Sequence, residues 1–85
     1  MRIYETSKFK RLRKKLRSEN EKEALKRAIA EVAADPRVGK PLKGEFKSLW
    51  RFPYNVAGQE KRLIYQAEKD CLYLLSFGPR EGIYQ

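Results

Sequence analysis

The residues best suited to chemistry in this chain are a cation and a tyrosine that follow an apolar stretch. Residues 71–77 carry two hydroxyls, on Tyr73 and Ser76, and no charge, in a chain of which 36% of the residues are charged, so they predict a central strand buried on both faces. Gly78-Pro79 is expected to end this strand, because proline donates no hydrogen bond to a ladder. Arg80 and Tyr84 should then lie at the rim of the sheet. A cation beside an aromatic ring suits RNA, since the cation attracts phosphate and the ring stacks on bases.

The composition indicates one small, strongly basic domain spanning residues 1–85. The formal net charge is +9, from 20 Lys and Arg against 11 Asp and Glu. Such a surplus attracts polyanions in a salt-dependent way, but it also fits a ribosomal protein, a peripheral membrane protein or a partner of an acidic chain. No apolar run approaches the roughly 20 residues of a membrane helix, and the first residues do not resemble a signal peptide. We therefore expect a soluble cytoplasmic protein.

The sequence contains no pattern that predicts a cofactor site or a metal site. Cys71 is the only cysteine and can form no internal disulfide, which fits a reducing compartment. The chain has no histidine to activate that thiol, so we interpret Cys71 as core filler. No spaced Cys/His set predicts zinc, and no glycine-rich loop has the spacing of a nucleotide site, so no cofactor is expected.

Two helices are predicted after a short first strand at residues 2–5. Thr6 or Ser7 is expected to cap the first helix. A capping-box spacing starts the second helix at Ser18, with Asn20 as the alternative, and Asp35-Pro36 ends it because the residue before proline is disfavoured in the α region. We expect the two helices to form an antiparallel hairpin.

Three further strands should complete the fold. Residues 38–44 are rich in glycine and proline and predict a loop, and residues 46–54 predict a strand whose far end Pro53 confines to an edge or a bend. Residues 61–67 and then 71–77 should follow as the other strands of an antiparallel meander. The predicted fold class is therefore α+β, with both helices on one face of the sheet.

The first helix offers candidate phosphate contacts on its outward side. Phe9, Leu12 and Leu16 recur at i, i+3 and i+7 and form a narrow apolar seam, so the lysines and arginines between them point outward. The candidates among these are Arg11, Lys14 and Lys15. An ordinary solvated helix surface explains the same pattern, since charge runs are usually solvated.

Arg62 is the candidate site residue within the sheet. The strand period of two places Leu63 and Tyr65 on one face and Arg62 on the other. If the helices cover the first face, Arg62 points to the open one. Cations that could converge with it there are Lys43, Arg51 and Arg80. Alternatively, Arg62 is a structural ion-pair partner of Glu60 or Glu68.

Five short segments together resemble the RelE/ParE toxin superfamily of type II toxin-antitoxin systems. They are, in order, Pro41-Leu42-Lys43-Gly44, Leu49-Trp50-Arg51, Arg62-Leu63-Ile64-Tyr65, Ser76-Phe77-Gly78-Pro79-Arg80 and Ile83-Tyr84. None is specific alone, but the ordered set covers almost the whole chain. The resemblance implies a RelE-like microbial-ribonuclease-type fold and an antitoxin encoded beside the toxin. It also implies, for the RelE branch, cleavage of mRNA in the ribosomal A site and, for the ParE branch, inhibition of DNA gyrase.

The resemblance also implies roles for individual residues. By position, Arg62, Arg80 and Tyr84 correspond to residues linked to catalysis in RelE-type enzymes, and their joint presence favours that branch. Metal-independent cleavage has the 2′-OH attack its own phosphate, which needs a base, cations for the growing charge and a donor to the leaving oxygen. Arg62 would clamp phosphate, Arg80 would stabilise it or donate a proton, and Tyr84 would stack on a base. Among the lysines, Lys43 is the candidate base, with Lys40 and Lys47 as alternatives and as RNA contacts.

The sequence departs from the family pattern at the general base. Arg51 and Pro53 stand where the best-known RelE members carry second-strand lysines, and the histidine that other members use is absent. Arginine is a poor base because it hardly deprotonates, so Arg51 is assigned to phosphate binding. We expect a ribosome-dependent mRNA endoribonuclease without cofactor, held by an acidic antitoxin in a hetero-oligomer. A ParE-like gyrase inhibitor and a non-catalytic RNA-binding domain are the alternatives.

Overall fold

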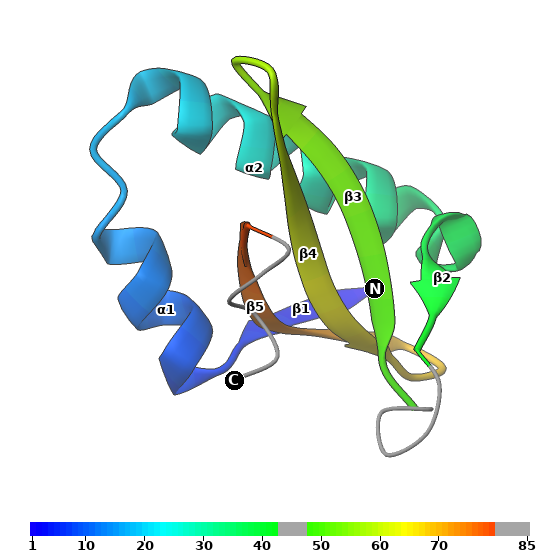
Figure 1. Cartoon of the computed structure of the whole chain (residues 1–85). Helices are drawn as coiled ribbons and strands as arrows, with labels where there is room; N and C mark the ends of the chain where they lie inside the picture. The colour runs from blue at the N-terminus through cyan, green and yellow to red at the C-terminus, as the bar shows by residue number, and fades with distance from the viewer. Residues whose placement is uncertain (43–47, 80–85) are drawn as a thin grey trace.

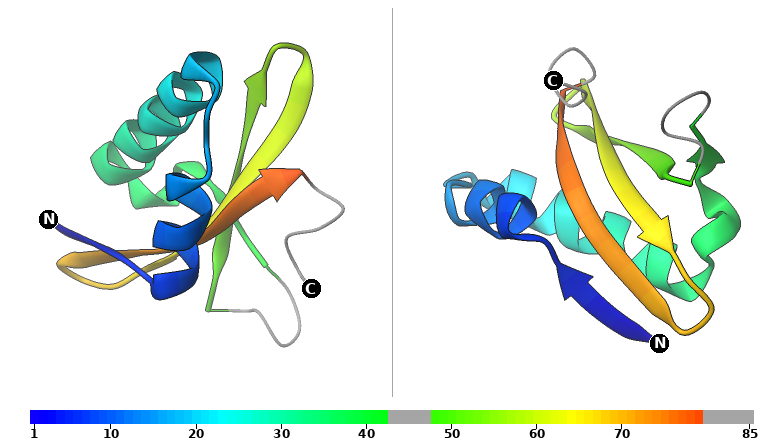
Figure 2. Two further views of the ribbon diagram at one scale, coloured as in Figure 1. Left: turned by 90° about the vertical axis from the view of Figure 1, so that its left-hand side faces the viewer. Right: turned by 90° about the horizontal axis from the view of Figure 1, so that it is seen from below.

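The computed structural model describes residues 1–42 and 48–79. Within these residues, five strands form one sheet in the order β1-β5-β4-β3-β2, with β1 parallel to β5 and the other neighbours antiparallel. Both helices lie on one side of this sheet, as Figures 1 and 2 show. The elements are β1 (Arg2–Glu5), α1 (Ser7–Lys14), α2 (Glu19–Ala34), the 3-10 helix η1 (Pro36–Val38), β2 (Lys40–Pro41), β3 (Trp50–Val56), β4 (Gln59–Ala67) and β5 (Cys71–Pro79). The predicted α+β class is confirmed.

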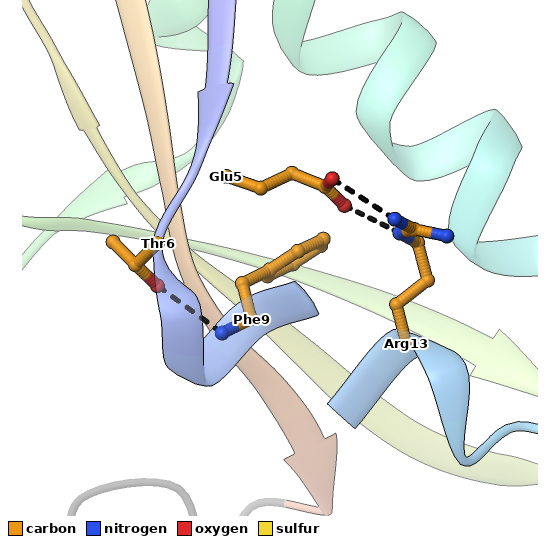
Figure 3. Close-up of polar contacts among 4 residues, drawn as sticks. All are labelled: Glu5, Thr6, Phe9 and Arg13. Atoms are coloured by element: carbon orange, nitrogen blue, oxygen red, sulfur yellow. Dashed lines mark hydrogen bonds and ion pairs between the residues drawn. The ribbon is translucent and has the colours of Figure 1, made fainter. Parts of the chain in front are cut away.

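Side-chain caps fix where the two helices begin. The Thr6 hydroxyl accepts a hydrogen bond from the Phe9 amide at 3.1 Å (Figure 3). It also donates to the Leu75 carbonyl at 3.2 Å, so it joins α1 to the sheet. The Ser18 hydroxyl accepts from the Glu21 amide at 3.4 Å. Each cap satisfies an amide that has no partner within its helix. Thr6 rather than Ser7, and Ser18 rather than Asn20, are therefore the caps.

The core lies between the helices and the sheet. Phe9 is fully buried and meets Phe77 edge to face, with ring centroids 5.1 Å apart. Leu74 on β5 is 2% exposed. The other core residues are Leu25, Ala28 and Val32 on α2, Leu63 and Tyr65 on β4, and Leu72 on β5. Phe9, Leu63 and Tyr65 lie on the faces predicted for them, as expected of one helix side and alternate strand positions.

Two expectations for β5 need correction. Leu72 and Leu74 face the core and are buried, whereas Cys71 and Tyr73 on the other face are only half-buried. Ser76, which pairs with Ile64 on that other face, is buried, so the strand is buried on both faces only toward its C-terminal end. The strand also continues to Pro79, which pairs with Lys61 in the register. A proline is tolerated there because it is the last residue of the strand, where one missing amide interrupts no ladder.

The prediction of a loop at residues 38–44 was only partly right. It contains the short strand β2, which pairs Lys40 with Arg51 and Pro41 with Trp50. Because β2 covers only the start of β3, Pro53 lies on an uncovered edge, as predicted. Within the described residues, β3 starts at Trp50, and Phe46 lies outside that part of the chain. Neither helix in the described part of the chain has the length and apolar content of a membrane span.

An ion pair fastens α1 to β1 and gives a pH prediction. Arg13 donates to both carboxylate oxygens of Glu5, with Nη2 3.0 Å from Oε1 (Figure 3), and this hydrogen bonding lowers the pKa of Glu5 below its ordinary 4.5. Because the pKa of Glu5 is lower in the folded than in the unfolded protein, the ion pair stabilises the fold at any pH above the unfolded-state pKa. This stabilisation is lost as the pH falls through the folded-state pKa. Glu5→Gln should therefore lower the melting temperature slightly at pH 7 and not at all at a pH low enough to protonate Glu5 in the folded protein. Equal melting curves of parent and variant at pH 7 would contradict this.

Candidate active site

Three of the predicted site residues lie on the sheet face opposite the helices. Arg51 pairs with Lys40 on β2 and with Ile64 on β4, and Arg62 pairs with Pro53 on β3. Directly opposed residues of antiparallel strands share a face, and Leu63, next to Arg62, faces the helices. Arg51 and Arg62 are therefore diagonal neighbours, at the roughly 7–8 Å that separates such positions. Lys40, Arg51 and Arg62 form a row across β2, β3 and β4, which we call the cationic row.

Arg62 is buried although it carries a permanent charge. The residue is 7% exposed, so the face is not open at this point as the sequence suggested. Its Nη2 lies 3.8 Å from Oε2 of Glu60, a side chain that is half exposed. Within the described residues its Nε is buried without a hydrogen-bond partner. Glu60 is thus a weak partner, and Glu68 instead accepts a hydrogen bond from Gln66 at 2.9 Å.

The electrostatics of the cationic row favour an anionic ligand. Removing a guanidinium from water costs several kcal/mol unless charge and hydrogen bonds compensate for it, and a single contact at 3.8 Å supplies little of either. Lys40 and Arg51 face each other directly, and like charges in that position destabilise a sheet. Neither of the two forms an ion pair within residues 1–42 and 48–79. A phosphate could offer Arg62 the paired acceptors that its planar donors fit.

Tyr65 holds β2, and with it Lys40, against the sheet. Its hydroxyl donates to the Pro36 carbonyl at 2.6 Å and accepts from the Gly39 amide at 3.2 Å. Burial raises the pKa of Tyr65, so the hydroxyl keeps the proton that it donates. A Cβ on Gly39 would collide with this hydroxyl and with the Arg51 carbonyl, so only glycine lets the chain approach so closely. Local sequence patterns do not predict this bridge, because it joins residues 26 and 29 positions apart.

Three further predicted site residues lie away from the cationic row, and four lie outside the described residues. Arg11, Lys14 and Lys15 are exposed on α1, which packs on the other side of the sheet, and with Ser7 and Lys10 they line a shallow hollow. The structure therefore does not bring them to the cationic row. Four predicted residues lie outside the described residues: Lys43, Lys47, Arg80 and Tyr84.

Two features of the surface were not predicted from the sequence. Tyr4 on β1 stacks on Tyr73 of β5, with ring centroids 5.4 Å apart and planes 20° from parallel. Both fall on alternating positions of strands, a signal that would have placed them on one face once the pairing of β1 with β5 was known. A second feature is a groove between the end of α1 and the side of α2, lined by Arg13, Leu16, Lys22, Leu25, Lys26 and Ile29.

Solved structures resemble this fold at low sequence identity. One is a chain of the intact E. coli RelBE toxin-antitoxin complex, with a TM-score of 0.75 and 21% identity over 94% of this chain and 96% of that one. Another is the conserved hypothetical protein HP0894 from Helicobacter pylori, with a TM-score of 0.53 and 18% identity over 94% of each chain. No curated protein matches the chain.

The family assignment rests on the sequence as a whole. Residues 3–85 match the family model described as ParE-like toxin of type II bacterial toxin-antitoxin system. This match spans nearly the full chain, and the RelBE likeness agrees with it at the level of the fold. The predicted membership of the RelE/ParE superfamily is thus confirmed, and the chain belongs to the ParE-like toxins of type II bacterial toxin-antitoxin systems.

Proposed function

We propose that this toxin is a ribosome-dependent mRNA endoribonuclease that uses no metal ion. The observation that carries the proposal is the cationic row, in which Arg62 is 7% exposed and its Nε has no hydrogen-bond partner among the described residues. A buried, incompletely paired cation beside further cations is a site prepared for phosphate. The fold shared with a chain of the E. coli RelBE complex also supports this proposal.

The reaction is a displacement at phosphorus. The 2′-oxygen of the ribose forms a bond to the adjacent phosphorus as the bond to the leaving 5′-oxygen breaks, which produces a 2′,3′-cyclic phosphate and a 5′-hydroxyl. A base takes the proton of the 2′-OH, and a donor supplies one to the 5′-oxygen. Arg62 stabilises the charge that grows on the non-bridging oxygens, and Arg51 and Lys40 hold neighbouring phosphates. For the base we propose Lys43, with Lys40 and Lys47 as alternatives, for the proton donor Arg80, and for base stacking Tyr84.

The test runs the purified toxin in two assays side by side. Primer extension on mRNA in programmed ribosomes should reveal new 5′ ends within the coding sequence. Free mRNA should remain uncut, because the ribosome supplies the in-line geometry that this small site lacks. Uncut mRNA in programmed ribosomes would refute the proposal.

Gyrase inhibition is the second candidate, and the match to a ParE-like family model favours it. The discriminating assay is DNA supercoiling by gyrase with the same toxin preparation. Blocked supercoiling together with uncut mRNA would establish this alternative. Failure in both assays would leave a protein that binds RNA without cutting it.

We further propose that an acidic antitoxin, partly disordered when free, docks in the groove between α1 and α2. The floor of this groove is apolar, from Leu16, Leu25 and Ile29, and its rim is cationic, from Arg13, Lys22 and Lys26. A short helix with apolar residues on one side and acids beside them complements such a groove. The net charge of +9 adds long-range attraction for an acidic chain.

A charge reversal tests this docking. Lys26→Glu should weaken antitoxin binding about tenfold, because it turns an attractive rim charge into a repulsive one. Lys69→Glu makes the same change in the turn between β4 and β5 and should bind like the parent. Affinity is measured by calorimetry with the protein encoded beside the toxin. Equal antitoxin affinities of Lys26→Glu and Lys69→Glu would refute the proposal that the antitoxin docks in this groove.

A further inference from the structure

A pair of stacked tyrosines, one exposed and one half-buried, lies on the same sheet face as the cationic row. Tyr4 is the partner of Tyr73 in the parallel register of β1 and β5, and Tyr4 is 42% exposed. Tyr73 alternates with Leu72 and Leu74, which face the helices, so both rings lie on the opposite face. Arg2, also exposed, lies two residues before Tyr4 and therefore on this same face.

The pair and the cationic row lie within reach of one strand of nucleic acid. Arg62 pairs with Gly78 on β5, five residues along the strand from Tyr73. At about 3.3 Å per residue this separation is about 16 Å along the sheet. An extended single strand with one phosphate at Arg62 therefore spans the distance to the tyrosines with a few nucleotides.

The exposed ring has no structural task that accounts for it. Residues that stabilise a fold bury their apolar area, whereas Tyr4 lies on an edge strand and remains 42% exposed although its ring is stacked on Tyr73. A ring already held flat by a neighbour is a preorganised stacking surface, because little rotamer freedom remains to be lost on binding. Bases of any kind stack on such a surface, and a nearby arginine contacts the phosphate.

We propose that Tyr4, supported by Tyr73 and flanked by Arg2, is a base-stacking platform that extends the RNA site of this toxin beyond the cationic row. The inference rests on the proposed function for its ligand, single-stranded RNA. It assigns to β1 a part in binding RNA and none in cleavage. Base-paired RNA offers no free face to the ring, so the platform selects single strands.

Binding of a short fluorescein-labelled oligouridylate to the full-length toxin, followed by anisotropy, tests the platform. Tyr4→Ala should weaken binding about 5- to 150-fold, the range for the loss of one stacked base, and Tyr4→Phe should bind like the parent. Ile3→Ala is the matched control, since Ile3 is 45% exposed on the same strand but on the other face, and it should change nothing. When the oligonucleotide is annealed to its complement, Tyr4→Ala and the parent should bind alike.

Each outcome separates the platform from the endoribonuclease proposal. Parental binding by Tyr4→Ala, an equal loss in Tyr4→Phe or no binding by the parent itself would overturn the platform. None of these results bears on mRNA cleavage in programmed ribosomes, which is measured independently. Conversely, weakened binding by Tyr4→Ala together with uncut mRNA would support the platform and refute the endoribonuclease.

Discussion

Arg62→Ala is expected to slow mRNA cleavage in programmed ribosomes by about 10²- to 10³-fold, which is the usual effect of removing one preorganised donor to a developing negative charge. Arg62 is 7% exposed, so its charge acts in surroundings that screen it less than water does. The measurement is the single-turnover rate with saturating toxin. Arg62→Lys should recover part of the rate, because it restores the charge but not the paired donors.

Arg11→Ala is the matched control for this prediction. It also removes one arginine charge, but from the exposed surface of α1, on the helix side of the sheet. Its cleavage rate should stay close to that of the parent. If the two variants lost activity equally, net charge rather than the cationic row would govern cleavage. Thermal melting must show that Arg62→Ala is folded, which we expect because the charge it removes is poorly compensated.

Leu74→Ala should lower the free energy of unfolding by about 2–5 kcal/mol, through lost transfer energy and the cavity left behind. Leu74 is 2% exposed and pairs with Glu5 on β1 and with Tyr65 on β4, so it lies where three strands and the helices meet. A loss of this size is a large share of the roughly 4–13 kcal/mol that a domain of 85 residues possesses. The variant should be partly unfolded at physiological temperature.

Urea denaturation followed by circular dichroism measures this loss. Leu75→Ala is the control. The side chain of Leu75, next to Leu74, is only half-buried, so its removal should lower the free energy of unfolding clearly less than Leu74→Ala does. If Leu74→Ala unfolded at the same urea concentration as the parent, the placement of β5 in the core would be wrong.

The sequence predicted elements whose signals are local. Phe9 recurs with its neighbours at helical spacing, so the first helix was found with its core face, and Ser18 stands three residues before Glu21, which placed the start of the second helix. Along β4 the strand period of two separates Leu63 and Tyr65 from Arg62, although Ile64 between them is also apolar, and it placed Arg62 on the correct face. Periodicity reports the direction in which a side chain points.

Features that depend on tertiary pairing were missed. The strand β2 has two residues, too few to carry a period, and it is defined by its pairing with Trp50 and Arg51. The burial of Arg62 could not be predicted either, because periodicity assigns a face but does not say how much of that face is covered. The stack of Tyr4 on Tyr73 requires β1 to lie beside β5, a contact between the two ends of the chain.

The chemical state of the mRNA ends at the cut tests the central claim most directly, because attack by the 2′-oxygen is the step that the cationic row is proposed to stabilise. Fragments released from programmed ribosomes are analysed by mass spectrometry after treatment with the parent toxin. The account predicts a 2′,3′-cyclic phosphate on the upstream fragment and a 5′-hydroxyl on the downstream one. A 3′-hydroxyl upstream with a 5′-phosphate downstream would mean that water attacked instead, and would contradict it.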